Sequence, residues 1–130
     1  MKKLKEQKIL NNFLYLKEHP IKGKCVHISI ACKNGDLIDV NPVITYPFLP
    51  EGHKLLDWSM EWTDTEDALA LGLMNLLNHS SNSNCYLIND YETKTKRLYA
   101  KRDLLPDEEL TIKYACELWF EEEKINKSSK

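Results

Sequence analysis

The sequence predicts a mainly β domain of short strands, with short helices inserted between them. Three observations support this class. Apolar and polar residues alternate in several short segments, turn-forming residues separate these segments, and only two segments have the spacing of helices. The chain has 130 residues, which suits one domain, and 42% of them are hydrophobic, which is enough to bury a core.

The first third of the chain is expected to be strands and turns. Predicted strands cover residues 11–19, 24–31 and 36–46. Asn34-Gly35 supplies the positive φ angles of a tight turn, so residues 28–44 are expected to form a hairpin. Pro42 marks an edge or a bend, because it cannot donate a hydrogen bond to a neighbouring strand.

The middle of the chain is expected to contain a loop and a helix. Residues 47–54 are rich in Pro and Gly and form the loop, whereas 55–62 fit either a strand or a helical turn. A helix is predicted over 67–77, with Thr63 or Thr65 as its cap. Gly72 lies inside this helix, at a cost of about 1 kcal/mol relative to Ala, which indicates a close contact there.

The last third returns to strands. We expect a strand at each of 85–90, 97–104 and 110–114, with a polar hairpin turn after the first and the turn LPDEE before the last. A short helix is predicted over 116–125.

Charge and composition exclude several classes of protein. The formal charge of −2 and the pI of about 6.1 do not indicate nucleic-acid binding, and no apolar run is long enough to span a membrane. Residues 1–20 lack the core of a signal peptide, so the protein is expected to be intracellular. The cysteines and histidines are too dispersed for a disulfide framework or a metal site: these are Cys25, Cys32, Cys85 and Cys116, with His19, His27, His53 and His79.

A dense polar stretch follows the predicted helix. Residues 76–85 read LLNHSSNSNC, and their Asn and Ser side chains compete for the hydrogen bonds that a helix needs. Two other segments accompany it, GKCV at 23–26 and AKRDLLPDEELTIKY at 100–114.

Together these three segments resemble the SET domain of S-adenosylmethionine-dependent protein-lysine methyltransferases. The family pattern is G-x-G with an apolar pair, N-H-S-x-x-P-N, and A-x-R-D-I-x-x-G-E-E-L-T-x-x-Y. Cys25 replaces the second glycine and Ser83 the proline. The resemblance covers residues 13–120, preceded by a basic segment at 1–12 and followed by a tail at 121–130.

The resemblance implies the β-clip fold of this family, in which the N-H-S segment and the strand ending in the key tyrosine form a pseudoknot. It also implies S-adenosyl-L-methionine as the cofactor, no metal, and a protein lysine as the substrate. Tyr114 would be the catalytic residue, and Tyr86 would line the substrate channel. The expected cofactor-binding residues are Gly23, Lys24, Cys25, Asn78, His79, Tyr114 and Trp119.

Each of these residues also has an ordinary structural interpretation. Tyr114 is also typical of a strand end, Asn78 of a helix cap, and Trp119 of a buried anchor for the last helix. Two other classes remain open: a non-catalytic SET-like module that binds a protein or peptide, and an unrelated small β interaction domain.

The expected partner is a protein or peptide bearing a lysine, without direct nucleic-acid or membrane binding. Phe48, Trp58 and Trp62 make residues 47–62 apolar enough for a peptide groove or a homodimer contact, although at least one Trp is expected in the core. The cytoplasm is the expected compartment for a bacterial protein, with the nucleus or a host cell as alternatives.

Overall fold

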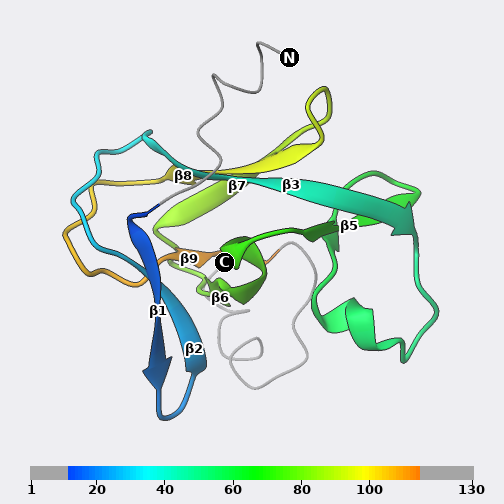
Figure 1. Ribbon diagram of the computed structural model, residues 1–130, viewed down its shortest axis with the longest axis horizontal. Coiled ribbons are helices and arrows are strands. Elements are labelled where there is room, and N and C mark those ends of the chain that lie inside the picture. Colours follow the sequence, from blue (N-terminus) through cyan, green and yellow to red (C-terminus); the bar gives the residue numbers. More distant parts are fainter. Residues whose placement is uncertain (1–11, 115–130) are drawn as a thin grey trace.

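The computed structural model describes residues 12–114 of the chain, and strands dominate this part, as predicted (Figure 1). The predicted helix at 116–125 lies outside the described residues. The strands are β1 Leu14–His19, β2 Gly23–Ile28, β3 Leu37–Pro47, β4 Met60–Glu61, β5 Glu66–Ala70, β6 Asn78–His79, β7 Cys85–Asp90, β8 Thr95–Ala100 and β9 Thr111–Ile112. Two short 3₁₀ helices are η1 Lys54–Asp57 and η2 Leu73–Leu76.

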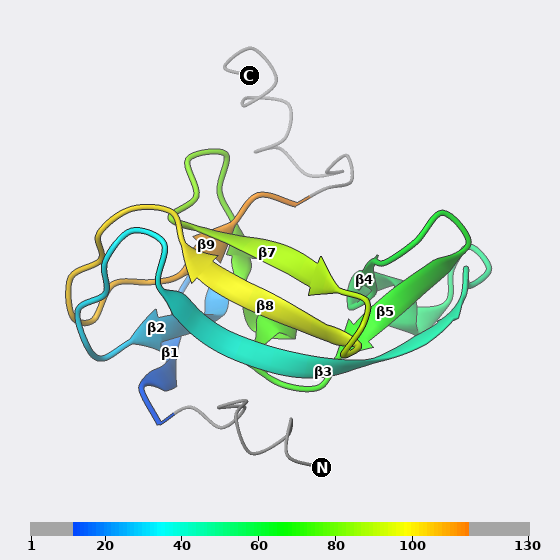
Figure 2. The same ribbon diagram turned by 90° about the horizontal axis from the view of Figure 1, so that it is seen from above.

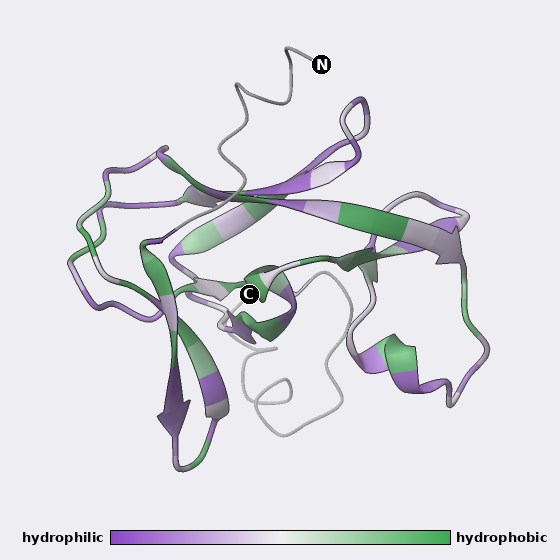
Figure 3. Ribbon diagram, in the orientation of Figure 1, coloured by the Kyte–Doolittle hydropathy of each residue, from purple (hydrophilic) through white to green (hydrophobic). Residues whose placement is uncertain are grey.

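The described strands form three small sheets. The largest has the order β4-β5-β3-β8-β7, while β1 pairs with β2 and β6 pairs with β9. The β6–β9 pair is parallel, and all the others are antiparallel. Figure 3 shows hydrophobic residues over much of η2 and on one part of β3, whereas the β7–β8 turn is hydrophilic.

Strand β3 changes partner at Pro42. Its first part pairs with β8 as far as Pro42↔Thr95, and its second part pairs with β5 from Val43↔Ala70 onward. A residue without an N–H group is tolerated at such a junction, and its carbonyl still accepts from the Leu71 amide at 2.8 Å. The predicted bend is therefore the point where one long, curved strand joins two parts of the sheet (Figure 2).

The predicted hairpin over residues 28–44 is wrong. The turn at Asn34-Gly35 exists, with Gly35 at φ +91°, but it does not join paired strands. Strand β2 pairs with β1 on one side. On its other side it contacts residues 108–110, with Leu110 N donating to Val26 O at 2.8 Å. Residues 108–110 therefore occupy the edge of β2 that was expected to pair with β3.

The predicted helix over residues 67–77 is also wrong. Residues 66–70 form β5, where Ala68 and Ala70 are buried on one face while Leu71 is half exposed. Thr63 closes a turn before the strand, since its Oγ1 accepts from the Glu66 amide at 3.0 Å. Pairing with β3 and β4 overrides the helical spacing of the sequence, and only η2 is helical.

Side chains connect the two outer strands of the large sheet. From the β7 side, Asn89 Nδ2 donates to Glu61 O at 3.3 Å, and Tyr91 OH donates to Trp62 O at 2.8 Å. Lys96 Nζ on β8 donates to Glu61 O at 2.9 Å. The sheet therefore curls until β4 approaches β7. No helix in the part of the chain described here is long and apolar enough to cross a membrane.

Candidate active site

The polar segment at 78–84 lies directly against the strand that leads to Tyr114. In the β6–β9 pair Asn78 faces Thr111 and His79 faces Ile112, and the Ser80 amide donates to Ile112 O at 2.9 Å. These two pieces of chain, about 30 residues apart in sequence, lie side by side, as the expected pseudoknot requires (Figure 1).

Asn84 connects this crossing through its side chain. Its Nδ2 donates to Glu109 O at 2.8 Å, and its Oδ1 accepts from the Thr111 amide at 2.9 Å. Asn84 is only 4% exposed, so water could not replace it as the partner of the Glu109 carbonyl and the Thr111 amide. This segment is rich in Asn because the buried backbone at residues 109–111 needs hydrogen-bond partners, which the Asn84 side chain supplies.

Tyr114 is fixed at both its main chain and its hydroxyl. The Tyr114 amide donates to His79 Nδ1 at 2.9 Å, and the two rings lie 5.1 Å apart. The phenol hydroxyl donates to Leu77 O at 2.8 Å. Since Nδ1 accepts, a neutral His79 carries its proton on Nε2. The His79 side chain therefore orients the tyrosine, a role that the sequence did not predict.

A cleft with a volume of about 1320 Å³ opens beside Tyr114. It runs along β7 toward η1 and β4 and contains the predicted channel residue Tyr86, whose ring stacks on Tyr99 at 5.5 Å. Its lining residues are mostly apolar at the β7 side, whereas its charged residues are Asp57, Glu61, Asp67, Lys96, Lys101 and Lys113. Tyr114 and Tyr86 therefore line the same cleft, which is large enough for an extended side chain of a bound peptide.

The tryptophans of residues 47–62 divide between cleft and core. Trp58 lines the cleft and is 45% exposed, whereas Trp62 is buried in the core at 5%. Phe48 is also exposed, at 56%. The structure therefore agrees with the expectation that this segment carries both a core Trp and an exposed apolar surface.

The predicted cofactor residues 23–25 begin strand β2. Gly23 has φ +81°, and a Cβ atom built there would meet no atom of the described residues 12–114 within 4 Å. Lys24 is exposed. Cys25 is fully buried, and its Sγ accepts from Asn78 Nδ2 at 3.2 Å. The extra side chain at Cys25 therefore lies among protein groups and leaves the Gly23 backbone open to a ligand.

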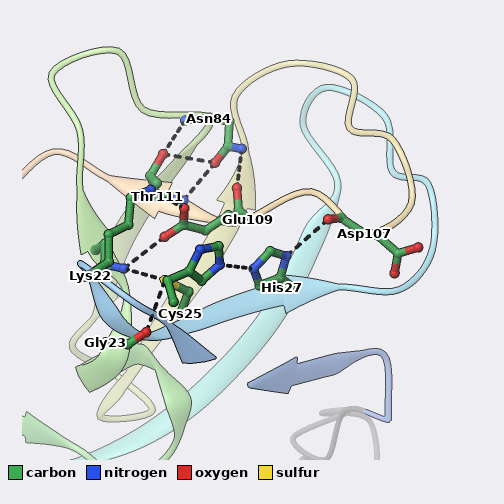
Figure 4. A network of polar contacts seen from close by, with 10 residues as sticks. Lys22, Gly23, Cys25, His27, Asn84, Asp107, Glu109 and Thr111 are labelled. Carbon is green, nitrogen blue, oxygen red and sulfur yellow. Dashed lines mark hydrogen bonds and ion pairs between the residues drawn. The ribbon is translucent and has the colours of Figure 1, made fainter. Parts of the chain in front are cut away.

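Lys22, Cys25 and Glu109 lie close together in a polar network (Figure 4), and Asn78 joins it through hydrogen bonds to Glu109 and Cys25. Glu109 Oε2 accepts from Asn78 Nδ2 at 2.9 Å, and Glu109 Oε1 accepts from Lys22 Nζ at 2.7 Å. Burial alone would raise the pKa of Glu109, but the hydrogen bonds from Asn78, Lys22 and Cys25 outweigh it and lower the pKa. Burial raises the pKa of Cys25, and the Glu109 carboxylate raises it further, so the thiol stays protonated at neutral pH.

The two adjacent glutamates have different partners. Neighbouring residues on a strand point to opposite faces, so Glu108 and Glu109 are not expected to share a site: one would face solvent and the other would contact a nearby backbone or basic group. Glu108 pairs with Arg102 at 2.9 Å and accepts from the Leu105 amide at 2.7 Å, whereas Glu109 faces Lys22 and Asn78. Only Glu109 therefore reaches the candidate site.

The remaining expectations concern Trp119, the cysteines and a metal site. Trp119 lies outside the described residues, so the structure places no side chain for it. Cys25, Cys32 and Cys85 are free thiols. Within residues 12–114, no three His, Cys, Asp or Glu side chains come together as a metal site.

Comparisons with known proteins agree with this fold. The family model described as "SET domain" matches residues 2–115. The chain is 26% identical over 125 residues to the histone-lysine N-methyltransferase, H3 lysine-37 specific, of Schizosaccharomyces pombe. That match covers 92% of this chain and 85% of the relative. A crystal structure of a Plasmodium falciparum protein matches with a TM-score of 0.68 and 22% identity, over 85% of this chain and all of that one.

The fold and the site thus define a mainly β domain with a crossed segment beside a cleft. The chain belongs to the SET domain family, since the family model covers most of its length. This confirms the predicted family and fold. The family and the fission-yeast relative also bear out the predicted class of enzyme, a protein-lysine methyltransferase.

Proposed function

We propose that this chain uses S-adenosyl-L-methionine to methylate a lysine side chain of a protein. The observation that carries the proposal is the position of Tyr114, whose hydroxyl is fixed at 2.8 Å from Leu77 O at the edge of a large cleft. The same crossing brings Asn78 and His79 beside the tyrosine strand. A binding module without catalysis has no need to hold a phenol in this way.

The residues present fit the cofactor. The open space at Gly23 suits main-chain contacts from residues 23–25, and these residues are joined to Asn78 through Cys25. Asn78 and the main chain of His79 would contact the adenine and amino-acid ends, Tyr114 would lie near the methyl group, and Trp119 would stack near the adenine. When bound, the cofactor supplies a methyl group on a sulfonium for transfer to an uncharged lysine amine.

Tyr114 would act by alignment. A phenol oxygen can accept a hydrogen bond while its own O–H donates, as it does here to Leu77 O, so Tyr114 would accept from the substrate amine. Holding two reactants in line can lower a barrier by about 7–11 kcal/mol in favourable cases. The amine has a reference pKa of about 10.4, so it must lose a proton first, and a dry cleft that disfavours the charged form assists this loss.

The substrate would be a lysine on a protein, entering along the cleft past Tyr86 and Trp58. The matched relative from fission yeast is named for a histone lysine, so histones are the first proteins to test. We also propose an intracellular location, where such substrates and the cofactor are found.

Thermal unfolding with cofactor tests the proposal directly. S-Adenosylmethionine or S-adenosylhomocysteine at millimolar concentration should raise Tm, because a ligand that binds only the folded state stabilises it. Mass spectrometry of histones and of a protein extract should then show methylated lysines. A protein that binds neither ligand would instead be a non-catalytic SET-like module.

A further inference from the structure

The side-chain carboxamide of Asn78 has an oxygen and an NH₂ group, and its hydrogen bonds define which of the two faces Glu109. Nδ2 contacts two acceptors, Glu109 Oε2 at 2.9 Å and Cys25 Sγ at 3.2 Å. A carboxylate can only accept, so this end of Asn78 must be the NH₂ group. Among residues 12–114, no hydrogen bond is made to Asn78 Oδ1, so this oxygen is available to a donor.

The two oxygens of Glu109 are used separately. Oε1 accepts from Lys22 and Oε2 accepts from Asn78. The Glu109 side chain is only 15% exposed, so water is a poor substitute for either donor, whereas Lys22 is 53% exposed. A glutamine at position 109 would have one accepting oxygen for the Lys22 and Asn78 donors, and the Cys25 thiol would also compete for it.

We propose that Glu109 is a positioning residue, which holds the Asn78 carboxamide with its oxygen presented to an N–H donor of the cofactor. This inference rests on the proposed function. The donor is either the 6-amino group of adenine or the α-ammonium group, and both have the chemistry that Asn78 Oδ1 requires. Cys25 takes part because its Sγ provides the second acceptor for the Asn78 NH₂ group.

The substitution Glu109→Gln should reverse Asn78. Lys22 is a charged donor and takes the single oxygen of the glutamine, so the glutamine NH₂ group faces Asn78. The Asn78 oxygen then faces the glutamine NH₂ group. The Asn78 NH₂ group is presented to the cofactor, where it opposes another hydrogen-bond donor. Removing Lys22 as well, in Lys22→Met with Glu109→Gln, frees the glutamine oxygen to accept from Asn78 and should restore the original orientation.

The test compares three ligands by calorimetry. These are S-adenosylhomocysteine, its 6-oxo (inosine) analogue, which lacks the adenine amine, and an analogue that lacks the α-amino group. The wild-type protein should prefer S-adenosylhomocysteine by about tenfold over the analogue that lacks the donor taken by Asn78. The analogue that is discriminated against identifies the donor.

In Glu109→Gln this preference should fall to about twofold or less. It should return in the double variant, and Lys22→Met alone should keep it. Glu108→Gln is the matched control, since Glu108 pairs with Arg102 on the other side of the chain and should leave the preference unchanged. In the ligand-free protein, NMR should show the Asn78 side-chain amide protons exchanging with water faster in Glu109→Gln than in the wild type.

Several results would overturn the inference. These are an unchanged preference in Glu109→Gln, an equal loss of affinity for all three ligands, no rescue in the double variant, or a wild type that discriminates against neither analogue. A wild-type protein that binds S-adenosylhomocysteine and methylates lysine while showing any of these would disprove only the role of Glu109. Failure to bind S-adenosylhomocysteine at all would disprove the proposed function as well.

Discussion

At the scale of single residues, Tyr114 combines two separable properties. Its ring packs beside His79 at 5.1 Å, while its hydroxyl donates to Leu77 O. Phenylalanine keeps the ring and removes only the hydroxyl. We therefore expect Tyr114→Phe to reduce the rate of methyl transfer by about 100-fold or more, the range for a group that acts on the reacting atoms.

The same substitution should change cofactor affinity by no more than about threefold, since the main-chain amide still donates to His79. Single-turnover kinetics and calorimetry measure the two effects separately. A parallel loss of rate and affinity would show that the hydroxyl organises the cofactor site instead of aligning the amine.

Gly72 illustrates a residue whose importance is steric. A Cβ atom at this position would collide with the side-chain amide of Asn41, which also accepts from the Met74 amide at 3.2 Å. The Asn41 side chain is only 4% exposed and also bonds to Asp39 and to the Met74 amide, so it has little room to move away. We expect Gly72→Ala to lower the free energy of unfolding by about 1–3 kcal/mol.

Urea denaturation measures this loss. The backbone at Gly72 is extended, with φ 167°, so the cost comes from the collision and not from the conformation. A wild-type midpoint in Gly72→Ala would show that Asn41 can move aside. The sequence analysis expected a close contact here, and the structure confirms it even though the predicted helix around it is wrong.

At the scale of elements, the crossing of β6 and β9 depends on Asn84. Replacing Asn84 by Ala would leave Glu109 O and the Thr111 amide without their buried partner. Each unsatisfied group costs about 1–3 kcal/mol, so we expect Asn84→Ala to destabilise the fold by about 2–4 kcal/mol in chemical denaturation.

Asn82→Ala is the matched control for this prediction. Asn82 is an exposed residue of the same segment, and its substitution should change the stability by less than about 0.5 kcal/mol. Equal effects at the two positions would mean that Asn84 contributes through general loop structure and not through its bonds to the tyrosine strand.

The elements also show what the sequence can and cannot predict. Strands β1, β2, β7 and β8 were predicted, because short alternating patterns and turn residues are local signals. The helix at 67–77 and the hairpin at 28–44 were wrong, because their segments pair with distant strands. Local spacing carries no information about such partners.

The candidate site divides in the same way. Tyr114, Asn78 and His79 were predicted from the motifs, and the structure brings them together. The roles of Glu109 and of the His79 ring were not found, because each acts on a residue more than 30 positions away. Lys22 and Glu109 are 87 positions apart in the sequence, so they form an ion pair only after the chain has folded.

At the scale of the whole molecule, the curled sheet creates the cleft. Strand β7 and the segment from η1 to β4 form opposite parts of its lining, and residues of the crossing form its end. Lys96 connects these parts, since its Nζ donates to Asn89 Oδ1 at 2.7 Å as well as to Glu61 O. The shape of the cleft is therefore coupled to one buried amine.

This coupling predicts a pH dependence. Burial lowers the pKa of Lys96 from 10.5 to about 8, and the Glu61 carboxylate offsets this only in part. Between pH 8 and 10.5 the unfolded chain thus holds a proton that the folded one has released, so this group makes folding more favourable as pH rises. Urea titrations at pH 7 and pH 10 should show the free energy of unfolding of the wild type increasing relative to Lys96→Met. A constant difference would mean that the Lys96 amine remains charged in the fold, stabilised by its carbonyl partners.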